Sequence, residues 1–397
     1  MKLEDTFLKH FSDIDDPRLS SHRNFRHRLE DLLIIAILGT ICGADGWVEI
    51  HRFGLAKQEW LDTFLELPNG IPSHDTFGRV FSQLDPKTFE QCFMEWLGSL
   101  HVDVNKEIIA LDGKTLRGSG NKRAKKSPLH IVSAWATQHR LLLGQVKTQN
   151  HSNEIKAIPT LLNMIDIQGS TITIDAIGCQ TNIAKQIRSQ GANYVIALKA
   201  NQPTLHNSVK SIFDLAEEGE KKYKKMLHRR KVEKLHDHGR VETRRYTLLS
   251  ARDDNITFSL QFPGLTSVGK VDITRTTHHE VEHSTRYFLS SFHYEDIDDF
   301  MQAVRQHWQI EINLHWSLDV SFREDHSQIH VGHAAENLAL IRRIALNLLK
   351  QESTHKNGIS CRRKTAGWDN KYLLKVLSAD SALNKKQSGS VKNETVG

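Results

Sequence analysis

The stretch IIALDGKTLRGS, residues 108–119, runs from four apolar residues into an acid and then into two cations. An apolar run of this length predicts a buried strand, and Asp112 stands where the core of that strand is expected to end. Gly113 follows directly, and Lys114 and Arg117 supply the positive charge. The pattern therefore predicts a carboxylate held at the exit of a rigid strand, with cations beside it.

A second stretch, STITIDAIG at residues 170–178, repeats this arrangement, because Asp175 closes an apolar run and Gly178 follows shortly after it. If the two strands are neighbours in one sheet, Asp112 and Asp175 lie at the same edge and repel each other unless they share a cation. Oxygen ligands of this kind suit Mg²⁺ or Mn²⁺, and two such ions can activate the attacking oxygen and stabilise the leaving oxygen of a phosphodiester. Taken singly, each aspartate would instead be interpreted as a turn former or a helix N-cap.

A third carboxylate is expected on a helix packed beside those strand ends, and Glu311 is the first choice. The segment RQHWQIEINLHWSLD, residues 305–319, has a helical pattern. At steps of three or four residues, one face of this helix carries His307, Trp308, Glu311, His315 and Asp319. On spacing alone Glu311 could equally be a surface residue in i,i+4 pairs. The competing acids are Asp319, Glu324 and Asp325.

The first hundred residues are predicted to be helical. Residues 32–44 form an uncharged apolar run of 13 residues, shorter than the ~20 that a membrane helix needs, so a buried helix is expected. Helices over 57–67 and 74–84, joined by PNGIPS and capped by Ser73, have the outline of a helix-turn-helix. An ordinary helical hairpin has the same outline. The outer face of the second helix would carry His74, Thr76 and Arg79.

From about residue 105 the pattern changes to alternating strands and helices. The order of these segments through residue 200 predicts a mixed α/β sheet with helical cover. A lysine- and arginine-rich stretch and further alternating segments predict a β-rich insertion over about 203–300. We accordingly expect a helical N-terminal domain at 1–100, a catalytic domain at 105–350, and a C-terminal helix with a disordered tail at 351–397.

Charge and composition favour a polyanionic partner. The chain of 397 residues has a net charge of +6 and a pI near 9.0, and basic faces gain from counterion release on nucleic acid. A merely basic enzyme would show the same charge. The four cysteines are scattered, so neither a disulfide framework nor a cysteine zinc site is expected. We predict no signal peptide and no membrane span, and we expect a cytoplasmic protein.

Taken in order, several blocks of the sequence resemble the H-repeat-associated transposases. The blocks are IIALDGKTLRGS, ITIDAIGCQ, ALKANQPTL, HGRVETRRY, YFLSS and HW-x-IE-x-x-LHW-x-LDV-x-F-x-ED, and they run through nearly the whole chain. That family comprises bacterial insertion-sequence transposases of the DDE class with a ribonuclease H-like catalytic domain. The resemblance implies that Asp112, Asp175 and Glu311 bind two divalent ions, Mg²⁺ or Mn²⁺, and that the protein cuts and joins DNA.

The resemblance also implies how the chain meets DNA. Its partners would be transposon ends and target DNA, held by a homodimer in a synaptic complex within the bacterial nucleoid. Two alternatives stand beside the implied DNA contacts: Lys199 could only lay its side chain along the protein surface, and Arg240 and Arg244 could form a solvated charged face. The residues implied to contact DNA are Lys114, Arg117, Lys199, Asn201, Gln202, Arg240, Arg244 and His307.

One departure from the family pattern leaves alternatives open. Family members usually carry asparagine directly after the helical glutamate, whereas this chain has Ile312, with Asn313 one place later. A catalytically inactive or domesticated copy that only binds DNA is therefore an alternative, as is a nuclease of the same fold.

A zinc-protease pattern, H-E-x-x-H, also occurs at His279, Glu280 and His283. That chemistry needs a helix, whereas the flanking segments are β-rich and residues i and i+4 of a strand lie ~13 Å apart. We expect a tight hairpin turn there instead.

Overall fold

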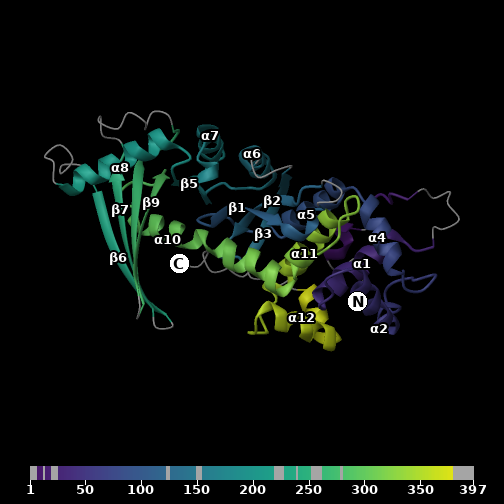
Figure 1. Cartoon of the computed structure of the whole chain (residues 1–397). Coiled ribbons are helices and arrows are strands. Elements are labelled where there is room, and N and C mark those ends of the chain that lie inside the picture. The colour runs from purple at the N-terminus through teal and green to yellow at the C-terminus, as the bar shows by residue number, and fades with distance from the viewer. Residues whose placement is uncertain are drawn as a thin grey trace, which may run out of the picture.

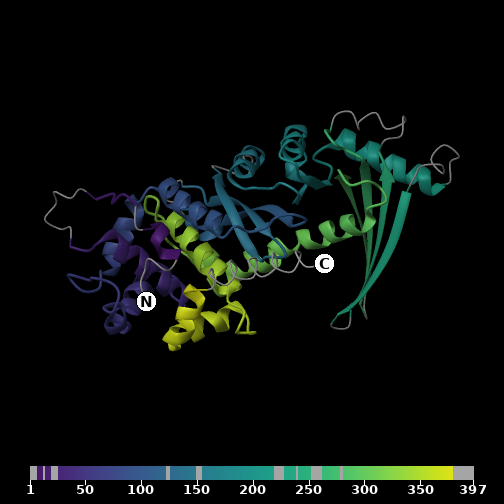
Figure 2. The ribbon, with the colours of Figure 1, turned by 180° about the vertical axis from the view of Figure 1, so that it is seen from behind.

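The structure is a computed structural model and describes residues 7–11, 14–18, 26–121, 126–148, 154–218, 228–237, 240–251, 262–277 and 280–378. Figure 1 shows an elongated molecule in which a central sheet joins a helical end to a second, tall array of strands. Figure 2, from behind, shows that helices from both ends of the chain gather at the helical end. No helix in the described ranges is long and apolar enough to cross a membrane.

The apolar run that opens at Ile108 becomes β1 (Ile108–Leu116), which lies inside a nine-stranded sheet of order β3-β2-β1-β4-β5-β9-β8-β7-β6. Strands β2 (Leu129–Ala136) and β3 (Leu141–Thr148) continue antiparallel on one side of β1. On the other side, β4 (Thr171–Ile174) and β5 (Asn193–Leu198) run parallel to it. This topology is the predicted ribonuclease H-like mixed sheet, and the fold class is confirmed.

Helices cover both faces of these five strands. Helices α6 (Glu154–Met164) and α7 (Thr181–Ser189) lie on one face, and α10 (Ile297–His307) and α11 (Ala334–Gln351) lie on the other (Figure 1). Every residue of β2 is consequently buried, as expected for a strand with cover on both sides.

The insertion between β5 and α10 adds strands to the same sheet. After α8 (Pro203–Glu218), β6 (His228–Asp237), β7 (Arg240–Ser250), β8 (Ser267–Thr276) and β9 (Val281–Ser290) form an antiparallel meander. Strand β9 pairs antiparallel with β5, from Val195↔Ser290 to Leu198↔Tyr287. The insertion is β-rich as expected, and its strands are a continuation of the central sheet.

The expectation that the first strand ends at Asp112 was wrong. Strand β1 continues to Leu116, because residues 112–116 go on pairing with β2 as far as Leu116↔Leu129. Only the pairing with β4 stops at Leu111↔Ile174. Asp112 therefore lies in the middle of a strand, at the point where its neighbour on one side ends.

The N-terminal helices share one hydrophobic core with the end of the chain. The apolar run becomes the buried helix α1 (Leu29–Ile41), as predicted, and it packs against α11. Around this pair lie α2 (Trp47–Ala56), α4 (His74–Gln83), α5 (Pro86–Ser99), α12 (Ile359–Trp368) and α13 (Asn370–Leu377). The expected disordered tail begins beyond these helices, and residues 379–397 lie outside the described ranges.

The first helix of the expected helix-turn-helix differs from the prediction. Residues 57–67 contain only the single-turn helix α3 (Gln58–Leu61), and Leu67 has a positive φ of 38°, which no helix allows. The second helix forms as predicted, with the Ser73 side chain accepting a hydrogen bond from the Thr76 amide at 3.3 Å. In the place of the expected partner, α4 packs against α2 and α11.

Candidate active site

The three predicted acids line one cavity of about 470 Å³. Asp112 comes from β1, Asp175 directly follows β4, and Glu311 comes from the helix that crosses the sheet. Because Leu111 pairs with Ile174 in a parallel register, the two aspartates occupy equivalent positions on neighbouring strands. Residues distant in sequence are thus brought together at the point where β4 ends beside β1.

Glu311 lies on a π-helical turn. The helix that starts as α10 continues through the π-helical segments η7 (Glu311–His315) and η8 (Ser317–Ser321). A π-turn inserts one residue into the helical repeat and often occurs at functional sites. Here it brings Glu311 and His315 together toward β1.

Asp112, Glu311 and His315 form the tightest cluster of candidate ligands in the described part of the chain, with one ligand atom from each within 4.8 Å of the others. Nδ1 of the buried His315 lies 3.5 Å from Oδ2 of Asp112 and 3.4 Å from Oε2 of Glu311. Burial raises the pKa of Asp112 to about 8, and the neighbouring Glu311 carboxylate acts in the same direction. The hydrogen bond from His315 lowers the pKa of Glu311 to about 2. Two carboxyl groups thus crowd one place that a cation would stabilise.

Asp175 has a different environment within the same cavity. Its carboxylate lies 3.0 Å from Nζ of Lys199 and accepts a hydrogen bond from the Ala176 amide at 2.6 Å. Burial tends to raise its pKa, but the Ala176 and Lys199 hydrogen bonds outweigh burial and lower it. Asn201 and Gln202 donate to the carbonyl oxygens of Ala176 and Cys179 at 2.8 and 3.1 Å, respectively. These two residues, which we expected to line a DNA channel, therefore fix the turn that follows Asp175.

Comparison with known proteins identifies the family to which the chain belongs. The family described as "Transposase DDE domain" matches residues 104–348, and the family "DDE_Tnp_1-associated" matches residues 8–97. The chain belongs to the DDE transposase family. The "H repeat-associated putative transposase YhhI" of Escherichia coli K12 is 38% identical to this chain. The similarity covers 94% of this chain and 97% of the relative. The "Putative transposase YncI" of E. coli O157:H7 is 38% identical over 92% and 93% of the two chains.

One solved structure is similar over most of the chain. The cryo-EM structure of the piggyBac transposase synaptic complex with hairpin DNA covers 98% of this transposase and 82% of its own chain, with 11% identity and a TM-score of 0.41.

His307 faces the same cavity from the helix, one turn before Glu311. Its Nδ1 lies 3.0 Å from Oγ1 of Thr173 on β4. Burial lowers the pKa of His307 to about 4, although the carboxylates of Asp175 and Glu311 oppose this effect. The imidazole is therefore neutral at pH 7, so it can share a hydrogen bond but adds no charge to the site.

A second cavity of about 450 Å³ adjoins the first and is rich in arginine. The two cavities share Arg286, Val304 and Trp308, and the Arg286 guanidinium lies over the Trp308 ring at 4.8 Å. Burial lowers the pKa of Arg286, and the positive charges of Arg275 and Arg244 add to this effect. The arginines that line the second cavity are Arg240, Arg244, Arg275 and Arg286.

Only part of this arginine charge is neutralised by the protein. The buried Glu242 forms ion pairs with Arg244 at 2.5 Å and with Arg275 at 2.9 Å. Arg240 and Arg244, both predicted to meet DNA, thus line the cavity, and Arg244 is already paired. Arg275 and Arg286 were missed by the sequence reasoning, although both occur in alternating β-strand patterns that place every second residue on one face.

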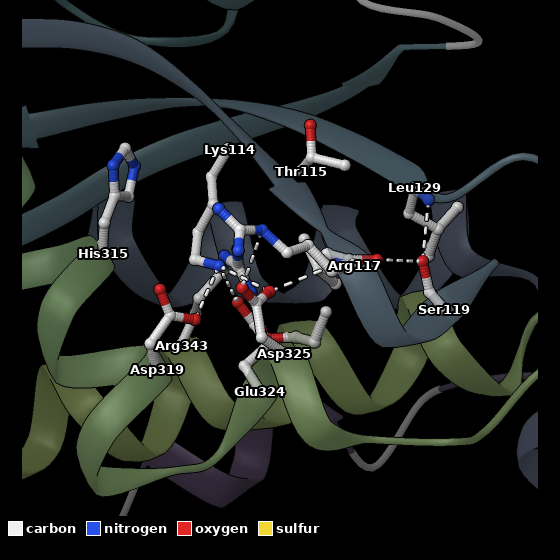
Figure 3. A network of polar contacts seen from close by, with 12 residues as sticks. Lys114, Thr115, Arg117, Ser119, Leu129, His315, Asp319, Glu324, Asp325 and Arg343 are labelled. Atoms are coloured by element: carbon white, nitrogen blue, oxygen red, sulfur yellow. Dashed lines mark hydrogen bonds and ion pairs between the residues drawn. The ribbon is translucent and has the colours of Figure 1, made fainter.

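Lys114 and Arg117 have separate environments (Figure 3). The Lys114 side chain is only 7% exposed and forms ion pairs with Asp319 at 2.7 Å and Asp325 at 3.1 Å. Arg117 is open to solvent, with its side chain 85% exposed and its Nε 3.5 Å from Asp325. The structure thus gives Lys114 internal partners where we expected a phosphate contact.

Gly113 leaves no open space beside Asp112. A Cβ at this position would lie 2.5 Å from Nε2 of His130 and 2.6 Å from Oε1 of Glu154. These two side chains form a hydrogen bond of 2.5 Å directly over the glycine. The missing side chain therefore makes room for a buried pair in the protein.

His315, which lies in one cluster with Asp112 and Glu311, is also absent from the predicted set. It lies four residues after Glu311 on the face that we had identified for this helix, so the helical spacing contained the signal. Ile312, which replaces the usual asparagine, lies away from the three acids: its side chain is 62% exposed and lines the arginine-rich cavity. Asn313 instead accepts a hydrogen bond from Lys350 at 2.9 Å.

The zinc-protease pattern falls in a hairpin between β8 and β9. Thr276 pairs with Val281, and His283 lies on β9 opposite Thr274. His279 lies outside the described residues. The strand conformation at His283 agrees with the expected hairpin.

Proposed function

We propose that this transposase cleaves DNA at the ends of an insertion sequence and joins the released strand to target DNA. The observation that carries the proposal is the cavity in which Asp112, Asp175 and Glu311 converge from two neighbouring strands and one helix. Three carboxyl groups in one cavity next to a set of arginines are suited to a phosphodiester substrate and to the cations that it requires.

The donor set fits divalent metal ions. Carboxylate oxygens favour Mg²⁺ or Mn²⁺. Burial and the neighbouring Glu311 carboxylate raise the pKa of Asp112, and a bound cation would act in the opposite direction. In the proposal Asp112, Asp175 and Glu311 hold two ions. When bound, such ions increase the acidity of a water molecule and stabilise negative charge on the leaving oxygen.

The protein side chains would orient these groups. Lys199 and the Ala176 amide hold the Asp175 carboxylate in its ionised form, and His315 bridges Asp112 and Glu311. In the first step, water attacks the phosphorus atom at the end of the element and the bond to the 3′ oxygen breaks, which leaves a 3′-hydroxyl. In the second step that hydroxyl attacks a target phosphodiester and displaces the target's own 3′ oxygen.

DNA would reach the acids along the arginine-rich cavity. Arg240 and Arg286 supply charge for backbone phosphates beside the active site, and Lys199 lies at its edge. Arg117 is exposed at the far end of β1 and is available to a longer duplex.

The helical region at 1–100 would recognise the ends of the element. Of the predicted outer residues of α4, His74 and Arg79 are exposed and Thr76 is half-buried, and His74 and Arg79 line an open cavity of about 920 Å³. A homodimer would hold the two ends of the element together, because strand transfer joins both ends to one target.

The proposal is tested with purified protein and DNA that carries the ends of its own element. With Mg²⁺ or Mn²⁺ the wild type is expected to nick this DNA, and a chelator is expected to stop the reaction. Asp112→Asn, Asp175→Asn and Glu311→Gln should each abolish nicking while DNA binding in a gel-shift assay persists. Asp62→Asn, on the exposed surface, is the matched control. Full activity in one of the three variants would exclude that residue from the catalytic set.

Two alternative functions give different results in the same experiment. An inactive copy would bind the ends and never nick them, and a nuclease would nick without forming joined products. The position of Ile312 favours an active enzyme, because its exposed side chain lies outside the cluster of Asp112, Glu311 and His315.

A further inference from the structure

Lys114 connects the strand that carries Asp112 to the helix that carries Glu311 (Figure 3). We infer that Lys114 is a positioning residue, which sets the distance between Asp112 and the Glu311–His315 turn and thereby the affinity of the site for its metal ions. This role deepens the proposed function and rests on it.

The geometry consists of two contacts that run side by side. Asp112 and Lys114 are two residues apart on β1, so both side chains project from the same face of the strand, ~6.6 Å apart. His315 and Asp319 are four residues apart, about one turn, on the π-helical stretch. Asp112 meets His315 at 3.5 Å and Lys114 meets Asp319 at 2.7 Å. The matched spacing fixes the register of the helix against the strand.

Charge and burial make the second contact strong. The Lys114 ammonium also lies 3.1 Å from Asp325 and 3.9 Å from the fully buried Glu324. Glu324 in turn forms an ion pair with the buried Arg343 of α11 at 2.7 Å. Removing Lys114 would leave Asp319 and Asp325 without their main cation, and repulsion between them would push the helix toward water.

The turns beyond these contacts are closely docked. The Arg117 amide donates to Oδ1 of Asp325 at 3.1 Å. A Cβ on Gly118 in η3 (Arg117–Ser119) would lie 2.3 Å from the carbonyl oxygen of Ser327, next to η9 (Glu324–His326). The stretch from Asp112 to Arg117 is therefore joined to the helix and its following turn at both ends, and Lys114 forms the charged contact between them.

The test replaces Lys114 by an apolar side chain of similar length. In Lys114→Met, hydrogen exchange measured by mass spectrometry is expected to speed up in peptides covering 308–322. Mn²⁺ affinity, measured from the electron paramagnetic resonance signal of free Mn²⁺, is expected to fall 10- to 100-fold, the usual effect of removing a group that orients metal ligands. Both measurements are made on folded protein well below its unfolding temperature.

Lys147→Met is the matched control. Lys147 on β3 pairs with Glu336 of α11 at 2.5 Å, so it also joins the sheet to a helix but not to the helix of the site. This variant is expected to keep wild-type exchange over 308–322 and wild-type Mn²⁺ affinity. If Lys114→Met does not fold, Asp319→Asn, which retains the shape of the side chain, is expected to show the same two effects.

Wild-type exchange over 308–322 and wild-type Mn²⁺ affinity in Lys114→Met and Asp319→Asn would overturn the inference while leaving the proposed function intact. Failure of the proposed function is a separate result, in which the wild type binds no more Mn²⁺ than Asp112→Asn. The exchange measurement needs no metal, so it decides in either case whether Lys114 positions the helix.

Discussion

Gly118→Ala is predicted to destabilise the protein severely. The added Cβ would lie 2.3 Å from the carbonyl oxygen of Ser327 and 2.6 Å from that of Asp325, against the ~3.3 Å at which carbon and oxygen normally meet. Both obstacles are backbone atoms, so the two turns must separate by about 1 Å. Overpacking of this kind costs about 3 kcal/mol, at the upper end of the usual range.

Urea unfolding followed by tryptophan fluorescence measures this cost. With a slope of about 3 kcal/mol per molar urea, the midpoint is expected to fall by about 1 M. Gly98→Ala is the control, because Gly98 lies in α5 with nothing within 4 Å of its added Cβ. That change should stabilise the protein by about 0.5–1 kcal/mol through helix propensity. Equal midpoints for the two variants would refute the docking of the two turns.

Three further predictions concern buried polar groups. Burial raises the pKa of Asp31 to about 6. The ionised carboxylate therefore lowers the stability of the folded protein above pH 4, and this loss is complete above pH 6. In thermal unfolding, Asp31→Asn should raise the free energy of unfolding by about 1–2 kcal/mol at pH 8 and leave it unchanged at pH 3.5. Arg343→Met should cost about 3 kcal/mol in urea unfolding, because it removes the buried partner of Glu324. Asn347→Leu should cost about 2–4 kcal/mol by the same measurement, since it leaves both backbone groups of Leu142 unpaired.

Each of these has a contradicting result. A constant difference between Asp31→Asn and wild type across this pH range would rule out the ionisation of Asp31 as its cause. A neutral Arg343→Met would mean that Lys114 alone compensates Glu324. Wild-type stability of Asn347→Leu would mean that water satisfies the strand at Leu142.

The sequence was sufficient to predict the central sheet and two of the elements that carry the acids. Apolar runs at 108–111 and 171–174 are local signals, and they correctly predicted neighbouring strands that place Asp112 and Asp175 at equivalent positions. The extent of β1 was not predictable in this way. Residues 112–115 are polar or glycine, and they stay in the strand because β2 pairs with them.

Burial of charge was the feature that local patterns could not show. Lys114 looks like a surface cation because its partners, Asp319 and Asp325, come about two hundred residues later in the chain. Asn201 and Gln202 likewise gain their contacts from the turn after Asp175, which is adjacent only in the fold. His315, in contrast, was within reach of the helical spacing, and only its tight contact with Asp112 needed the structure.

The pairing of β9 with β5 determines how a DNA substrate could enter. Because the insertion is hydrogen-bonded to the catalytic sheet from Val195↔Ser290 to Leu198↔Tyr287, swinging it aside would leave backbone groups of a buried strand unpaired, at about 1–3 kcal/mol each. The insertion is therefore a fixed wall beside the acids. In the proposed reaction the duplex, rather than the enzyme, would have to change shape, and the ease with which an end sequence bends or opens would contribute to its selection.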